Sequence, residues 1–573
     1  MMSTRSFMPR VLEAAHQALS PLERRFVVGC AALLIIGAIW GSTSLILSRT
    51  EAVPHEGGVY REGMVGQPRY IAPMLARTND VDMALSRVLY SGLLKLTSEN
   101  TLEGDLAESV DASEDGKVYT AHLREGITWH DGEPVTADDV VFTVQTIQNP
   151  DTKSPSAPSF QGVTVEKVDD RTATFTLREP YAPFPYNLTI GIAPQHIWAT
   201  VEPQNIALAE QNLKPIGTGP FQFKKLRKRS LGEILEVELR RYDDYHGQRP
   251  FLDGITFTFF QSTEDLVRAF QRRTVDGMSF VSPSLVPEIE RIRHGTLHRV
   301  KLPQYFAVFF NQARNQTLSD RTVRTALDLA TDRETLIREA LRGEGMRADA
   351  PIPTGFLGRG AHIRNAEFSV EKAKQNLEEA GWKDTDGDGI REKGGTKLSL
   401  TLVTTDWPEY VTTAELLAAS WRSIGAEVGV ESKTVGTVQT EIIRPRNYDA
   451  LLYGEVLGAD PDPYPFWHST QTRDPGLNLA LYKDREADKL LEEARKTMDI
   501  ERRRATYEKF QERLLEELPA IFLYSPLYTY AVQPSVRGTM FEALPLPSER
   551  FTTVSSWYMR TKRIWKHEGV PSR

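Results

Sequence analysis

Two aspartates that alternate with prolines could bind a charged ligand. Asp460 and Asp462 alternate with Pro461 and Pro463 and follow an apolar run that ends near Tyr453. Because proline fixes its own φ angle, the backbone around both carboxylates is rigid. A rigid acid on a loop suits capture of an ammonium group through a charge-assisted hydrogen bond in a desolvated cleft. A proline-rich surface turn with solvated acids explains the same residues equally well, so both interpretations stay open.

A second acidic group has the spacing of a calcium loop. Asp384, Asp386 and Asp388, with the glycine that follows, give the pattern D-x-D-x-D-G. Position twelve of such a loop would be Gly395 instead of the bidentate glutamate, and Glu392 at position nine is the only later carboxylate. A polar turn between a helix and a strand is the simpler interpretation. We assign no metal, and calcium at this loop stays open.

The chain lacks the sequence patterns of well-known hydrolase and nucleotide sites. G-x-S-x-G, H-E-x-x-H and G-x-x-x-x-G-K-[ST] are all absent. His130, between Trp129 and Asp131, could act as a general base, yet a His-Asp-Gly turn before a helix that begins after Thr136 is the simpler interpretation. We therefore expect a protein that is not an enzyme and has no cofactor.

Composition narrows the class further. The 573 residues include 69 lysines and arginines against 77 aspartates and glutamates, a formal net charge of −8. This balance disfavours nucleic acid as a partner. Hydrophobic residues make up 40% of the chain and charged residues 25%, which is usual for a soluble globular protein, and a single cysteine excludes a disulfide within the chain. Most of the chain should fold in water as several domain-sized units.

One segment is apolar enough to cross a membrane. Residues 26–47 are 22 residues without a charge, which as a helix span roughly 33 Å. The arginines that precede the segment favour a cytoplasmic N-terminus by the positive-inside rule. We predict a cytoplasmic tail over 1–25, a single-pass anchor over 26–48 and a linker over 49–57, with the bulk of the chain in the periplasm or at the cell exterior.

Two alternatives concern processing of this segment. The small residues Ser42, Thr43 and Ser44 resemble a signal-peptide cleavage site, but the segment before the apolar run and the run itself are long for one. We therefore favour an uncleaved anchor. Cys30 has lipobox-like neighbours, yet it lies near the start of the apolar run and not at its end, so we expect no lipid there.

Strand-like and helix-like patterns alternate after the anchor, which predicts a mixed α/β fold. Residues 118–123 and 172–177 alternate like strands, and 305–310 and 520–532 are apolar and aromatic runs of buried-strand type. The spacing of apolar residues predicts a helix over 321–342 that stops before Gly343.

Several segments resemble the extracellular solute-binding proteins of family 5, the peptide-type receptors of ABC importers. The resemblance extends from about residue 59 to about residue 532. The segments that carry it are LYSGL (89–93), DLAES (105–109), the stretch 119–142 with WHDG, PIGTGPF (215–221), RYDDY (241–245), Asn311, VRTAL (323–327) with TDR (331–333), and AGW (380–382).

The resemblance implies a class II flytrap of two lobes joined by two crossing strands, over 304–311 and 520–530. Lobe I would then comprise 58–305, with an extra subdomain over about 78–212. Lobe II would comprise 306–522, and 523–573 would return to lobe I and form a C-terminal tail. The resemblance also implies a monomer that binds a short peptide and delivers it to an ABC permease in the membrane.

The resemblance further implies ligand-binding residues. Asp460 matches the aspartate that neutralises the α-amino group of a bound peptide, with Asp462 as second choice. The family's common tryptophan just upstream is absent here, where Gly-Glu-Val-Leu occupies 454–457. The cleft wall is expected to include Tyr90, Gly92, Tyr305, Asn311 and Trp407. The alternatives are the same fold with another cargo (a nickel chelate, haem, a sugar or an opine), an anchored sensory or scaffolding ectodomain, and an anchored hydrolase using an unrecognised carboxylate pair.

Overall fold

The computed structural model describes residues 20–566 except 231, 293–294, 361–362 and 364–365. Within this range the chain divides into two compact units. The larger unit is Gly57–Trp557, and the smaller one combines the described residues before Gly57 with those after Trp557.

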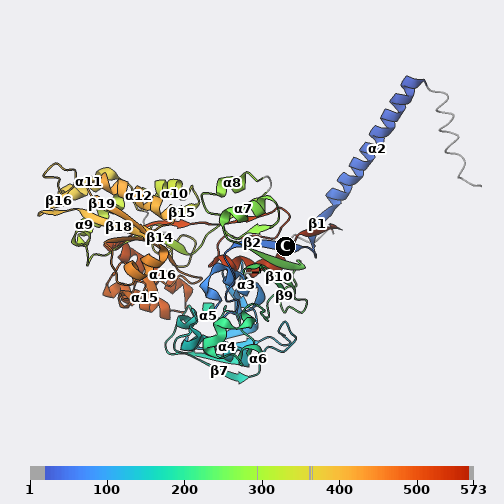
Figure 1. Cartoon of the computed structure of the whole chain (residues 1–573), viewed down its shortest axis with the longest axis horizontal. Helices are drawn as coiled ribbons and strands as arrows, with labels where there is room; N and C mark the ends of the chain where they lie inside the picture. The colour runs from blue at the N-terminus through green and yellow to red at the C-terminus, as the bar shows by residue number, and fades with distance from the viewer. Residues whose placement is uncertain (1–19, 231, 293–294, 361–362, 364–365, 567–573) are drawn as a thin grey trace, which may run out of the picture. The chain divides into compact units, whose positions relative to one another are not determined.

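The smaller unit contains the predicted apolar helix. α2 (Pro21–Arg49; labelled in Figure 1) begins with a capping box between Ser20 and Glu23. None of its side chains is buried. Its length and composition suffice to cross a membrane, as predicted. β1 (Thr50–His55) follows directly and pairs antiparallel with β23 (Arg560–Trp565), in place of the predicted linker.

A seven-stranded mixed sheet forms one part of the larger unit, with helices α7 (Thr263–Gln271) and α8 (Val286–Glu290) packed on it. Its strands come from both the N-terminal and the C-terminal part of the larger unit. Its strands, in spatial order, are β13 (Thr296–Val300), β22 (Tyr528–Val532), β12 (Gly277–Met278), β2 (Val59–Val65), β11 (Gly254–Phe260), β10 (Ile234–Arg241) and β9 (Phe221–Lys228).

A six-stranded sheet organises the second part, and helices cover both of its faces. On β14, Phe306, Val308 and Phe310 pack in the core cluster of α9 to α12, whereas the alternate residues pack in the cluster of α15 and α16. In spatial order the strands are β15 (Gly345–Arg347), β21 (Ala520–Pro526), β14 (Gln304–Phe310), β20 (Ala450–Val456), β18 (Ser399–Thr405) and β19 (Glu427–Lys433). The helices are α9 (Arg321–Leu329), α10 (Arg333–Ala340), α11 (Val370–Glu379), α12 (Pro408–Arg422), α15 (Arg485–Lys496) and α16 (Ile500–Glu517).

A four-stranded antiparallel sheet carries the third core of the unit. Its order is β5 (Ala107–Ala112), β6 (Val118–Leu123), β8 (Thr172–Leu177) and β7 (Val163–Asp169), and α4 (Ala137–Gln148) packs against it. The predicted strands over 118–123 and 172–177 are confirmed. So is the helix start, because Thr136 and Asp139 form a capping box at α4.

Two predicted elements are each interrupted. The helix expected over 321–342 is two helices, because the chain leaves α9 and Asp332 accepts a hydrogen bond from Thr335 as the N-cap of α10. The apolar run 520–532 is two strands, β21 and β22, that join different sheets on either side of Leu527. The chain therefore passes between the two large sheets at 301–303 and at 527, whereas the sequence placed these changes at 305–306 and 522–523.

A buried ionic group ties the end of the larger unit to its first strand. Arg550 donates to Glu62 on β2 at 2.7 Å, and both side chains are at most 1% exposed. Tyr60 and Tyr530 also donate hydrogen bonds to Glu62. This network joins β2, β22 and the segment around Arg550 in one core.

The segment that contains Gly217 has no room for a side chain. A Cβ on Gly217 would lie 1.9 Å from the carbonyl oxygen of Leu89. We expect Gly217→Ala to lower the free energy of unfolding by at least about 2 kcal/mol, because the backbone must shift. Gly436→Ala is the matched control, since nothing lies within 4 Å of its Cβ position, and it should leave stability within about 1 kcal/mol. Urea unfolding followed by tryptophan fluorescence measures both, and equal effects would contradict the packing.

Candidate ligand-binding site

A cavity of about 350 Å³ lies inside the larger unit. Its walls come from four stretches of the chain, 73–96, 156–191, 457–477 and 545–549. These stretches border α3 (Asp80–Leu89), the four-stranded sheet, the loop after β20 and the C-terminal part of the unit. Residues distant in sequence therefore meet here, which is typical of a binding site placed between lobes.

Asp460 lies in the loop after β20, where Gly458 at a φ of +85° lets the chain turn. Its Oδ2 accepts a hydrogen bond from Arg503 on α16 at 2.5 Å. Its Oδ1 is buried and receives no hydrogen bond from any described residue, although Asp460 lines the cavity. Desolvation, with a smaller contribution from Asp462, outweighs Arg503 and raises the pKa of Asp460 to about 6. A buried acceptor without a donor beside a cavity is suited to a ligand N–H group.

Asp462 also lines the cavity and has its own arginine. Arg495, in the last turn of α15, donates to Asp462 Oδ2 at 2.8 Å. The Tyr181 hydroxyl approaches the same oxygen at 3.5 Å, and the Tyr464 amide donates to Oδ1 at 3.2 Å. Asp462 is thus saturated by the protein, whereas Asp460 is not.

Two arginines lie in the wall stretch 73–96. Arg87 forms an ion pair with Glu549 at 2.5 Å, so the charge of each group is compensated by the other. Arg77 lines the cavity, is exposed, and makes no ion pair or hydrogen bond with the described residues. Protein atoms around it still desolvate the guanidinium and lower its pKa, and Glu549 only partly opposes this effect. Arg77 is therefore an unmatched cation that can receive a ligand carboxylate.

The structure brings Tyr90 to the same cavity as the two predicted aspartates. Tyr90 is 2% exposed, and its hydroxyl has no partner among the described residues. Burial raises its pKa. Gly92 is not a lining residue, but a Cβ there would lie 2.8 Å from the backbone of Thr189, so Gly92 lets the lining segment 189–191 approach.

The other three predicted wall residues lie away from the lining. Tyr305 is fully buried in the core of the six-stranded sheet, where it donates to Glu455 and accepts from Trp467. Asn311 closes the end of β14 by donating to the Arg446 carbonyl. Trp407 is 51% exposed and precedes the first turn of α12.

The sequence did not point to the arginines or to Tyr181. Arg495 and Arg503 are on helices rich in charged residues, where a run of Arg, Lys and Glu is the usual pattern of a solvated face. Only the tertiary fold separates them from exposed neighbours such as Arg504. Arg77 lies in a three-residue 3-10 helix (Ala76–Thr78) and Tyr181 in an irregular segment, and neither has a distinctive sequence pattern.

His130 has a structural role, as its turn context predicted. The Gly217 amide donates to Nδ1 at 3.1 Å, so Nε2 carries the proton and donates to the Gly219 carbonyl at 3.0 Å. Burial lowers its pKa to about 4, which keeps the ring neutral. His130 thus holds the 217–219 segment in place.

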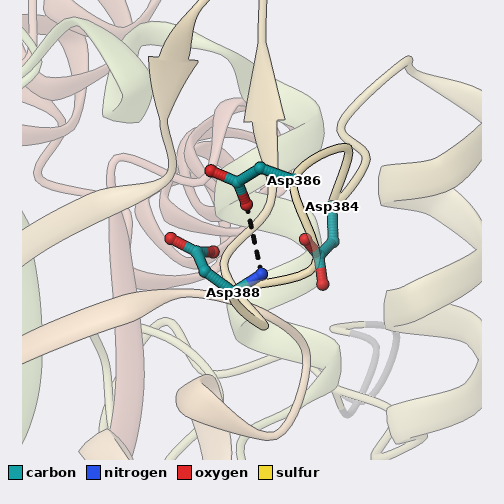
Figure 2. A group of neighbouring side chains, drawn as sticks. All are labelled: Asp384, Asp386 and Asp388. Atoms are coloured by element: carbon teal, nitrogen blue, oxygen red, sulfur yellow. Dashed lines mark hydrogen bonds between the residues drawn. The ribbon is translucent and has the colours of Figure 1, made fainter.

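The three aspartates of the calcium-like pattern do cluster. Figure 2 shows Asp384, Asp386 and Asp388 on one exposed loop, with their nearest oxygens within 4.8 Å of one another. Amides of the loop donate to Asp384, and Lys397 pairs with Asp388. These contacts already satisfy much of the acidic charge, as in an ordinary polar turn.

Two α/β parts linked by two chain crossings, with a cavity between stretches from both, define the class of two-lobed ligand-binding proteins. Residues 101–477 match the model of the bacterial extracellular solute-binding proteins, family 5 (middle). The chain belongs to this family, and the predicted family and α/β fold are confirmed.

Relatives of known structure or function agree with this assignment. The oligopeptide-binding protein AppA of Bacillus subtilis is 29% identical over 92% of this chain and 96% of its own. Its structure in complex with a nonapeptide gives a TM-score of 0.70 and covers 89% of this chain and 100% of that one. The dipeptide-binding protein of Escherichia coli is 27% identical over 86% of this chain and 93% of its own. NikZ of Campylobacter jejuni, in complex with Ni(L-His), is 26% identical with a TM-score of 0.72 and covers 87% of this chain and 99% of that one.

Neighbouring arginines on α16 test the pairing of Asp460. Arg503→Met leaves a carboxylate with a side chain 2% exposed and no cation, and should lower the free energy of unfolding by about 3 kcal/mol. Arg504→Met removes a pair whose arginine is 44% exposed and should change stability by less than about 1 kcal/mol. Urea unfolding compares the two variants. Similar small losses would show that Arg503 does not stabilise Asp460.

Proposed function

We propose that this protein binds short peptides with a free α-amino group and delivers them to an ABC permease. The observation that carries the proposal is the unpartnered Oδ1 of Asp460, a buried acceptor at the cavity. A peptide ammonium group supplies the missing donor and a positive charge beside two acids. Arg77 offers a cation for the carboxylate at the other end of a short peptide.

The size of the cavity supports a small ligand. At about 350 Å³ it lies at the lower end of the roughly 300–1,000 Å³ usual for ligand sites. Relatives named for oligopeptide and dipeptide binding support peptide as the ligand class. The protein acts without catalysis in this proposal, because it captures the peptide and releases it unchanged.

We further propose that α2 anchors the protein in the cell membrane and that the larger unit works outside the cytoplasm. The 29-residue helix is long enough to cross a bilayer, and none of its side chains is buried. The protein would act as a monomer beside its permease. Retention of α2 in protein isolated from membranes, detected by intact mass, tests this assignment against signal-peptide cleavage.

Native mass spectrometry of the full chain, purified in detergent without denaturation, tests the ligand class. We expect co-purified masses that match short peptides. A single non-peptide mass would show that the ligand is not a peptide and would identify the ligand class instead. An empty protein that also fails to bind a peptide library would refute the proposed function.

Asp460 gives the binding a characteristic pH dependence. Its carboxylate must be charged to attract the ammonium group, and its pKa is raised to about 6, so affinity should fall as the pH drops from 7 to 5. Asp460→Asn should weaken binding by about tenfold or more at pH 7 and remove this dependence. Isothermal titration with a tripeptide and its N-acetylated form provides the measurement. Equal losses for both peptides in Asp460→Asn would disprove the assigned role.

A further inference from the structure

A second and larger cavity adjoins the first. It has a volume of about 760 Å³ and is lined by 158–184, by Tyr464 and by the end of α15. Both cavities have Ser159 and Tyr181 in their walls. They are therefore neighbours, and side chains that line one or both of them form the partition between them.

The partition is the ion pair between Asp462 and Arg495. Asp462 lines the first cavity, whereas Arg495 lines the second, and 2.8 Å separates the two charged groups. The Arg495 guanidinium lies 4.1 Å from the ring centre of Tyr464 and 5.0 Å from that of Tyr181. Cation–π contacts on both rings hold the guanidinium across the boundary.

Tyr181 belongs to the segment beside the four-stranded sheet, whereas Asp462, Tyr464 and Arg495 belong to the part built on the six-stranded sheet. The Ala182 amide also donates to the Arg495 carbonyl at 2.8 Å. The two sides thus meet at the partition through the cation–π contact of Tyr181 with Arg495, the hydrogen bond from the Tyr181 hydroxyl to Asp462 and the backbone hydrogen bond from Ala182. The Arg495 side chain can leave the partition while the backbone hydrogen bond from Ala182 stays in place, because that bond uses the Arg495 carbonyl and not its guanidinium.

The second cavity suits the C-terminal portion of a peptide. Arg178 and Lys496 line it beside Arg495, against Glu179 and Glu492. Lys496 is 3.7 Å from Glu179, whereas Arg178 forms no ion pair with the described residues. Arg178 is therefore a cation available for a terminal carboxylate. The volume is about twice that of the first cavity, so additional residues have room.

We propose that the second cavity is the continuation of the peptide site and that Arg495 is the gate residue that limits ligand length. With the gate closed, a peptide begins at Asp460 and ends in the first cavity near Arg77. With the gate displaced, a longer peptide runs past Asp462 into the second cavity toward Arg178. This inference rests on the proposed peptide-binding function and adds the selection of ligand length.

The test compares the affinities of alanine peptides of two to eight residues for the full chain in detergent. Arg495→Ala removes the gate, and the ratio of octapeptide to tripeptide affinity should rise by about tenfold or more. Arg485→Ala is the matched control, because Arg485 is exposed at the other end of α15 and lines neither cavity. It should leave the wild-type length profile unchanged.

A double variant separates loss of the gate from misfolding. Arg495→Ala alone leaves the buried Asp462 unpaired, whereas Asp462→Asn with Arg495→Ala removes both charges. The double variant should show the same shift toward long peptides. An unchanged length profile in the double variant, with normal tripeptide binding, overturns the gate but leaves the proposed function intact. A wild-type protein that binds no peptide of any length overturns both.

C-terminal amidation of the octapeptide checks the assignment of Arg178. In the gate-free variant the amidated octapeptide should bind about tenfold more weakly than the free acid, and Arg178→Ala should abolish that difference. An equal affinity of acid and amide in the gate-free variant contradicts a carboxylate subsite in the second cavity.

Discussion

Burial of acidic groups beside a cavity is the physical constraint on which this site depends. A carboxylate removed from water must find cations or donors, or else become neutral. Asp460 and Asp462 are matched by Arg503 and Arg495, which lie on two different helices packed against the same sheet. The loop after β20 can therefore hold its acids only if α15 and α16 dock correctly. The charges of the binding site therefore depend on how α15 and α16 pack on the six-stranded sheet.

The two faces of the six-stranded sheet pack against different helices. One face packs α9 to α12, whereas the other supports α15 and α16, the helices that carry the paired arginines. Because side chains alternate along β14, a shift of one residue in its register would exchange the two cores. Its antiparallel pairing with β20 thus fixes where the aspartate loop begins.

The sequence predicted local features well and tertiary partners poorly. The strands over 118–123 and 172–177 and the capped start of α4 follow from alternation and capping, which are local properties. Asp460, Asp462 and Tyr90 were named from the sequence and line one cavity, and their role in ligand binding stays a prediction. Tyr305 could not be placed, because an aromatic residue on a buried strand faces either the cavity or the core, and only the pairing of β14 decides which. Arg495 and Arg503 were missed for a related reason, since charged helical residues look alike until the helix is packed.

The pairing of β1 with β23 has a practical consequence for anyone preparing a soluble fragment. A fragment that starts at Gly57 but retains β23 lacks β1, so β23 is left with unsatisfied backbone groups along one edge. Exposed strand edges of this kind recruit other chains and promote aggregation. A fragment from Gly57 to Trp557 contains neither β1 nor β23, and its ends are those of the larger compact unit.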